Sequence, residues 1–151
     1  MGPARQLRDN IKTLLDTLTD FEEVSKEPKF SFKGYPACFI APSGNDNDYL
    51  TTQDNVRIYA FKIWCFQEFE VTKIADAYNI LLDAVDNVIN KLDAEESPDL
   101  ASRTIDNGIS GAYTLANVFA VPGRFASDEV EKLLAVEITV RCKITVDLTQ
   151  L

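Results

Sequence analysis

Residues 30–66 contain two apolar runs, FSFKGYPACFI at 30–40 and VRIYAFKIWCF at 56–66, on either side of the polar stretch APSGNDNDYLTTQDN at 41–55. Both runs are rich in aromatic and β-branched residues, which favour strands. The polar stretch is far longer than the two to five residues that a hairpin connection usually takes, and long connections often carry function. We therefore expect two strands joined by a long loop, 41–55, that serves as an assembly arm.

The strand expected at 56–66 has apolar residues at both alternating positions, so we expect both of its faces to be covered. Phe61, Trp64 and Phe66 are then interpreted as core residues. The last third of the chain alternates more regularly. Valine, isoleucine and cysteine alternate with charged and hydroxyl residues over 136–146, which is typical of a strand with one face on the core and the other facing water or a partner.

Two stretches have helical spacing. Leucine, isoleucine and phenylalanine recur every three or four residues between Leu7 and Phe21, predicting a helix over about 4–20. A longer apolar stripe from Ile74 to Leu92 predicts a second helix over about 71–92, followed by a polar link at 94–99.

The remaining elements are strands and loops. We expect a weak strand at 104–109, a better one at 112–121 and a loop at 122–129. The predicted fold is α+β in a single domain, 1–151: an antiparallel (mixed) β-sheet with two main helices packed on one face, in the order α-β-β-α-β-β-β.

The charge balance limits the partners. The formal net charge is −9, from 15 basic and 24 acidic residues. Wrapping nucleic acid needs a concentrated cationic face, so this composition argues against it. An acidic wall repels phosphate and would instead let nucleic acid slide past.

Targeting signals and redox features are few. The first residues are polar and lead into a helical pattern, so we expect no signal peptide, and no apolar run approaches the ~20 residues of a membrane span. Cys38, Cys65 and Cys142 lie inside strand-like runs, and we expect buried free thiols. The chain has no histidine to complete a zinc site.

No catalytic motif is evident. Without histidine there is no histidine base or triad, and no glycine-rich phosphate loop occurs. Asp46-Asn47-Asp48 offers alternate oxygen ligands, but no glutamate lies where a calcium loop of the EF-hand type needs one. We expect no enzyme, metal or cofactor; a carboxylate-only enzyme is the distant alternative.

A family resemblance follows from residues 32–37 (FKGYPA), 41–43 (APS), Asp48-Tyr49 and 57–63 (RIYAFKI). Together with the long helix and late strands, they resemble tailed-bacteriophage proteins of the tail-terminator or tail-completion class, also called neck or head–tail joining proteins. The resemblance covers most of the chain in element order and about 30–63 in residue detail.

The resemblance implies a structural virion protein at the tail–neck junction. Such proteins form a ring, usually a hexamer, that caps the tail tube, ends its polymerisation and offers a surface to the head. The implied partners are copies of the chain, the tail-tube protein and neck or connector proteins. Phage DNA passes through without specific binding, and no membrane is involved.

Contact residues are expected in both loops. Aromatic and apolar residues within polar loops are common interface anchors. The expected subunit or partner contacts are Asn45, Asp46, Asn47, Asp48, Tyr49, Leu50, Arg124 and Phe125. A local mini-core beneath the first loop, and an ordinary turn at the second, are the alternatives. The acids expected to face the lumen are Asp83, Asp86 and Asp93.

Other functions remain open at this point. A different phage neck protein or a tail-tube-like structural protein fits the same pattern. A cytoplasmic adaptor or chaperone-like binding protein is the alternative from another class.

Overall fold

The computed structural model describes residues 2–29, 31–49, 54–94 and 112–151, and gives an α+β fold with one five-stranded mixed sheet, as predicted. Its strand order is β1-β2-β3-β5-β4, and every pairing is antiparallel except the parallel pair β1–β2. The elements are α1 (Pro3–Asp16), β1 (Glu23–Ser25), β2 (Ala37–Tyr49), β3 (Asp54–Glu68), η1 (Val71–Lys73), α2 (Ile74–Asp93), β4 (Tyr113–Asp128), β5 (Leu133–Asp147) and η5 (Leu148–Gln150).

The element order differs from the prediction. Three strands, rather than two, precede α2, because the three residues of β1 pair with Ala37–Phe39 at the start of β2. So short a strand leaves no readable alternation in the sequence. The strand expected at 104–109 lies outside the described residues.

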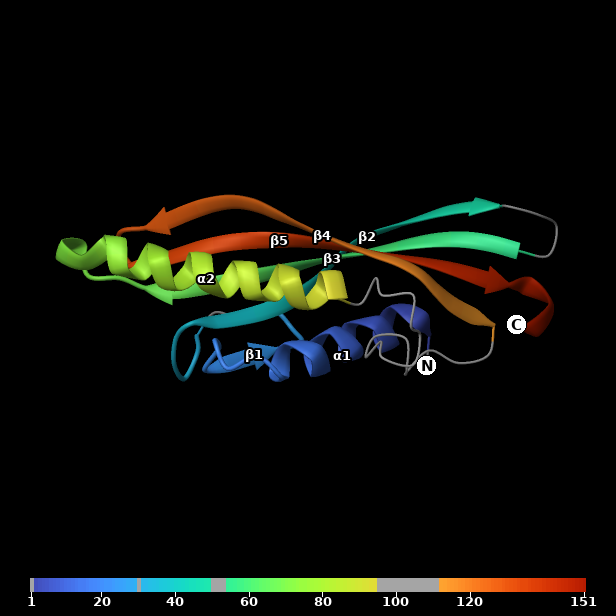
Figure 1. The fold of residues 1–151 in the computed structure, drawn as a ribbon, viewed down its shortest axis with the longest axis horizontal. Coiled ribbons are helices and arrows are strands. Elements are labelled where there is room, and N and C mark those ends of the chain that lie inside the picture. Colours follow the sequence, from blue (N-terminus) through green and yellow to red (C-terminus); the bar gives the residue numbers. More distant parts are fainter. Residues whose placement is uncertain (1, 30, 50–53, 95–111) are drawn as a thin grey trace.

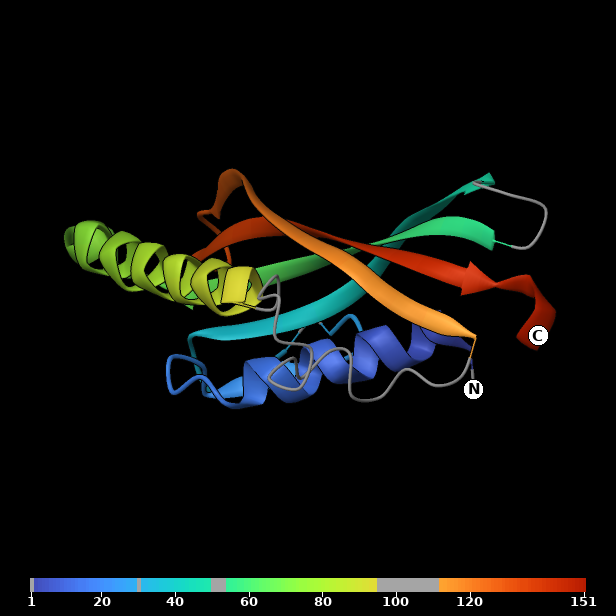
Figure 2. The ribbon, with the colours of Figure 1, turned by 45° about the vertical axis from the view of Figure 1, so that its right-hand side comes forward.

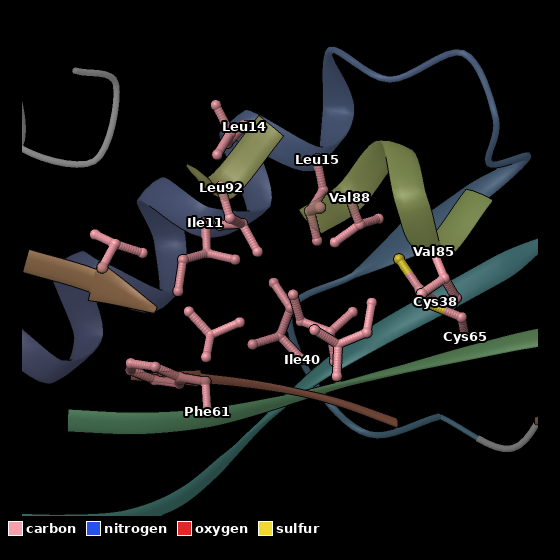
Figure 3. Packing of buried hydrophobic residues seen from close by; sticks show 14 of the residues in the cluster. Ile11, Leu14, Leu15, Cys38, Ile40, Phe61, Cys65, Val85, Val88 and Leu92 are labelled. Carbon is pink, nitrogen blue, oxygen red and sulfur yellow. The ribbon is translucent and has the colours of Figure 1, made fainter. Parts of the chain in front are cut away.

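Both helices lie on one face of the sheet. Their stripes, Leu7 to Leu15 on α1 and Leu81 to Leu92 on α2, are buried in a single apolar cluster together with alternate residues of the central strands. Figure 3 shows side chains from α1 and α2 converging above Ile40 and Phe61. The predicted helical spacing is thus confirmed, although α1 ends at Asp16 rather than near residue 20.

The sheet contributes its inner face through strict alternation. On β5 every second residue from Leu134 to Val146 is buried, which confirms the half-buried strand expected there. On β3, Phe61, Ile63 and Cys65 face the helices. Trp64 and Phe66 do not, so the expectation that both faces of this strand are covered is wrong: the helices cover one face only.

Two predicted loops are strands. Residues 41–49 continue β2 and residues 54–55 begin β3, so only 50–53 separate the two strands of this hairpin. Residues 122–128 belong to β4, with an irregular register between Pro122 and Phe125. Their Asn, Asp, Gly and Pro content argues against strand, but hydrogen bonding to a long neighbour overrides that weak preference, and proline is tolerated on an edge strand.

The first apolar run is also shorter as a strand than predicted. β2 begins at Ala37, and the preceding Tyr35–Pro36 peptide bond is cis. Phe32 lies before the strand, where its ring packs against Phe66.

Candidate assembly surfaces

The most prominent feature beyond the ends of the helices is the hairpin arm, formed by Gly44–Tyr49 of β2 and Asp54–Ala60 of β3. Its β3 strand also pairs with Arg141–Asp147 of β5, so the arm is the corner of the sheet at which β2 forms the edge. The ladder is continuous from the Gly44–Ala60 pair to the Tyr49–Asn55 pair. Figures 1 and 2 show the arm reaching beyond the ends of both helices. Such a projection is available to a neighbouring molecule.

The outer edge of β2 is free along most of the arm. β1 pairs only with Ala37–Phe39, so beyond these residues β2 has no second strand neighbour in the described part of the chain. β4 forms the opposite edge of the sheet. Unpaired edges present rows of backbone donors and acceptors, to which another strand can bind.

The contact residues predicted for the first loop lie on this arm. Asn45, Asp46, Asn47, Asp48 and Tyr49 are consecutive residues of β2, whereas Leu50 lies outside the described residues. The structure therefore brings five of the six together on one strand. Their contact with a partner stays a prediction.

The second predicted contact, Arg124 and Phe125, is a strand segment rather than a turn. The Phe125 ring packs against Tyr78 of α2, with centroids 6.2 Å apart and the planes inclined by 42°. Phe125 is thus partly used within the subunit, although 38% of it stays exposed. Arg124 is exposed.

Asp83, Asp86 and Asp93 all lie on α2 and are exposed. They alternate with Ala84, Val85, Val88 and Leu92, which are buried against the sheet. The three acids thus occupy the solvent side of the helix, and a lumen-facing role stays a prediction.

A surface that sequence reasoning missed lies on the side of the sheet without helices. Here β2, β3 and β5 form a hollow of about 540 Å³, termed the aromatic groove. Phe66 is at its centre, with ring centroids 5.5 Å from Phe32 and 5.6 Å from Phe39. The groove is lined by Lys29, Phe32, Phe39, Trp64, Phe66, Asp128, Glu131, Leu133 and Ala135.

The rim of the aromatic groove is mainly acidic. The Lys29 ammonium is paired with the Glu23 carboxylate, and this hydrogen bond holds the pKa of Glu23 below its ordinary value. Asp128 Oδ1 accepts hydrogen bonds from the backbone N–H groups of Val130 and Glu131, at 3.0 and 3.1 Å. Within the described residues no ion pair involves Glu131, so its carboxylate is available to an incoming cation.

The other end of the same face, termed the cationic half, combines two cations with two exposed apolar side chains. Phe119 pairs in register with Arg141, and Val121 with Thr139. Phe119 and Val121 are 49% and 54% exposed, and Arg141 and Lys143 are exposed too. An ion pair between Lys62 and Glu137, at 3.3 Å, lies between the aromatic groove and the cationic half.

The cysteines are free and buried, as predicted. Cys38 and Cys65 are directly opposite on β2 and β3, and Figure 3 shows both under Val85. The contact with Cys65, together with burial, raises the pKa of Cys38, and burial raises the pKa of Cys142 to about 12. The Cys38 and Cys142 thiols are therefore protonated at neutral pH and poorly nucleophilic.

Metal ligands and membrane spans were also sought. Among the described residues, no three or more Cys, Asp or Glu side chains gather as metal ligands. No helix in that part of the chain is long and apolar enough to cross a membrane.

A pattern in the sequence carries part of the signal for the aromatic groove. Phe39, Trp64 and Ala135 lie at positions that alternate with buried residues, and the strand register pairs Phe39 with Trp64 and Phe66 with Ala135. What the sequence does not reveal is which side of the sheet both helices occupy.

Comparison with solved structures finds chains of similar fold. The chain is similar to a chain of the solved structure titled "Virion of native gene transfer agent (GTA) particle", with a TM-score of 0.53 and 12% sequence identity. The match covers 95% of this chain and 91% of that chain. No family model and no curated protein matches the sequence. At this identity the likeness shows a shared fold.

Proposed function

We propose that the chain is a structural protein of a phage or phage-like particle and acts by binding rather than by catalysis. The observation that carries this proposal is the fold likeness to a chain of a gene transfer agent virion, which extends over 95% of the present chain. A match over nearly the whole length of both chains relates complete folds rather than a common motif.

The more specific role we propose is that of a tail terminator. Copies of the chain form a ring, with six copies the expected number, that caps the tail tube at the neck and ends its growth. The hairpin arm supports this role, because it extends beyond both helices and β2 has a free strand edge there. The sequence of the arm is mostly polar between Ser43 and Asn55, which suits a contact that forms only at assembly.

The charge of the chain supports passage of DNA without binding. The net charge is −9, and Asp83, Asp86 and Asp93 add to an acidic surface on α2. If these acids line the lumen, they repel the phosphate backbone and keep the channel from binding DNA.

The experiment is an elongation assay with the tail-tube protein encoded in the same genome. We expect the purified chain, added during polymerisation, to shorten the tubes and to fix their length distribution. A matched variant, in which Tyr49 and Leu50 are both changed to Ser, should leave the tubes longer. Tubes that grow to the same length with and without the chain would contradict the terminator role.

A further outcome separates the remaining structural roles. If the chain binds purified head or connector proteins but leaves tube growth unchanged, the neck role would replace the terminator role. If it is recovered from infected cells but not from purified particles, an adaptor or chaperone-like protein would replace both.

A further inference from the structure

We propose that two free copies of this chain pair through the helix-free faces of their sheets, with the aromatic groove of each against the cationic half of the other. This pairing goes beyond the tail-terminator role and does not depend on it.

The first observation is that this face is incompletely covered. Trp64, Phe66 and Phe39 are half-buried there, and the large side chains of Phe119 and Val121 are about half exposed. On the opposite face, alternate residues of the same strands are buried in one cluster with α1 and α2. Apolar side chains gathered in this number on one face usually mark a binding site, here in two parts separated by the Lys62–Glu137 ion pair.

The second observation identifies the occupant. Acidic groups lie at one end of the face, Asp128 and Glu131, and cationic groups at the other, Arg141 and Lys143. In a second copy related by a two-fold axis, the cationic end lies against the acidic end of the first copy, and its acidic end lies against the first copy's cationic end. A surface that complements itself in this way is the requirement of a two-fold interface.

The strand register supplies the alignment. Glu131 and Leu133 lie as many residues before Glu137 as Lys143 and Arg141 lie after it. A two-fold axis near Glu137 therefore places Lys143 of one copy over Glu131 of the other, and Arg141 over Leu133 of the aromatic groove. The Glu137 side chains lie near this axis, each paired with Lys62 of its own copy. Two sheets packed face to face in this way keep their strands nearly aligned.

The hairpin arm of a second copy suits the aromatic groove less well than the cationic half of that copy does. Its sequence carries Asp46, Asp48 and Asp54, and the rim of the groove is itself acidic. Like charges would oppose that contact. The cationic half has the opposite charge and is not repelled by the acidic rim.

The pairing has a structural consequence. A two-fold interface uses the same patch on both copies, so it closes on itself and cannot continue into a ring. Ring contacts must use other surfaces, such as the arm and the strand edges. Pairing would cover the apolar face of the free protein.

The test is sedimentation velocity of the full chain and two charge variants. The first variant carries Arg141→Glu and Lys143→Glu, and the second carries Glu131→Lys and Ala135→Lys. All four positions point away from the core, and thermal melting checks that each variant is folded. A control with the same charge change elsewhere, Arg5→Glu with Lys73→Glu, alters exposed residues on the helix side.

We expect the wild type and the control to sediment as dimers over about 1–100 µM, and each charge variant alone to dissociate at least ~10-fold more readily. An equimolar mixture of the two variants should dimerise again, because both contacts of the mixed pair then join opposite charges. If a variant does not fold, Phe119→Ser with Val121→Ser replaces it and should also weaken the dimer.

Several results would overturn the pairing. The pairing is wrong if the wild type stays monomeric over the whole concentration range, or if the charge variants dimerise as readily as the control. Failure of the mixture to dimerise, or assembly beyond two copies through this face, would equally contradict it. None of these results bears on tube capping, which the elongation assay measures separately.

Discussion

At the scale of single residues, Gly123 shows how closely β4 passes over β5. A Cβ atom at this position would lie 2.5 Å from the Glu137 Cγ and 3.0 Å from the Glu137 carbonyl oxygen. We expect Gly123→Ala to lower the free energy of unfolding by roughly 1–3 kcal/mol, as overpacking does. Urea denaturation measures the change.

Two variants serve as controls for this prediction. Gly2→Ala should be nearly neutral, since nothing lies within 4 Å of the added Cβ. Adding Glu137→Ala to Gly123→Ala should recover part of the loss by removing the Cγ clash. A neutral Gly123→Ala variant would mean that β4 has room to shift here.

The buried thiols predict an alkaline loss of stability. Burial raises the pKa of Cys142 from its ordinary 9.0 to about 12, so this thiol stays protonated in the native state while it ionises in the unfolded chain. The unfolded state therefore binds fewer protons, and the free energy of unfolding falls as pH rises from about 9 towards 12.

The measurement compares the wild type with Cys142→Ala across this pH range, which cancels the titration of lysine and tyrosine. We expect Cys142→Ala to have a lower free energy of unfolding than the wild type at neutral pH. As the pH rises, the variant should lose less of this free energy than the wild type does. Native protein should also resist a thiol reagent at pH 8. Parallel pH curves for the two proteins, or rapid labelling of Cys142, would contradict the assignment.

At the scale of elements, α2 offers two adjacent leucines in opposite environments. Leu81 is fully buried against the sheet, whereas Leu82 is 45% exposed. We expect Leu81→Ala to destabilise the protein by about 2–5 kcal/mol, because it loses apolar burial and leaves a cavity. Leu82→Ala should change stability by no more than ~0.5 kcal/mol, as surface substitutions usually do. Similar losses from both variants, measured by thermal and urea unfolding, would place the helix differently on the sheet.

The hairpin arm can be shortened without removing its base. Replacing residues 49–55 with Asn-Gly joins Asp48 directly to its partner Val56 through a two-residue turn that suits a hairpin. We expect the fold to persist, with a melting temperature within a few degrees of wild type, and tube capping to be lost. Circular dichroism measures the melting temperature, and the lengths of the tubes measure capping. Unfolding of the shortened protein would instead make the arm a structural element.

Helices and regular strands were predictable because their burial has a period. The stripe from Ile74 to Leu92 and the alternation from Val136 to Val146 each record one buried face in the sequence. The β2 strand of the arm was not, because its Asn and Asp residues have no such period and its extended form depends on pairing with β3.

The candidate surfaces were also predictable from the sequence only in part. Five expected contact residues, Asn45–Tyr49, lie on a strand rather than in the expected loop, and their contact with a partner stays a prediction. The aromatic groove was not predicted, because local sequence cannot say which face of β3 the distant helices cover. Trp64 and Phe61 look equivalent in sequence, yet only Phe61 joins the core cluster.

At the scale of the whole molecule, the fold has two layers, and one face of the sheet carries no helix. Helices α1 and α2 form one layer, the sheet forms the other, and the helix-free face, the arm and two strand edges remain available for contact. In the described part of the chain no cluster of metal ligands is present. The fold is like that of a chain from a gene transfer agent virion.

The central claim is that this chain caps a tail tube, and imaging tube ends by electron cryomicroscopy tests it most directly. Tubes grown from the tail-tube protein of the same genome would be incubated with the chain. The account predicts a ring of extra density at one end of each tube, with the hairpin arm of each copy in contact with a neighbouring copy or the tube. Bare ends, or density distributed along the tube walls, would contradict it.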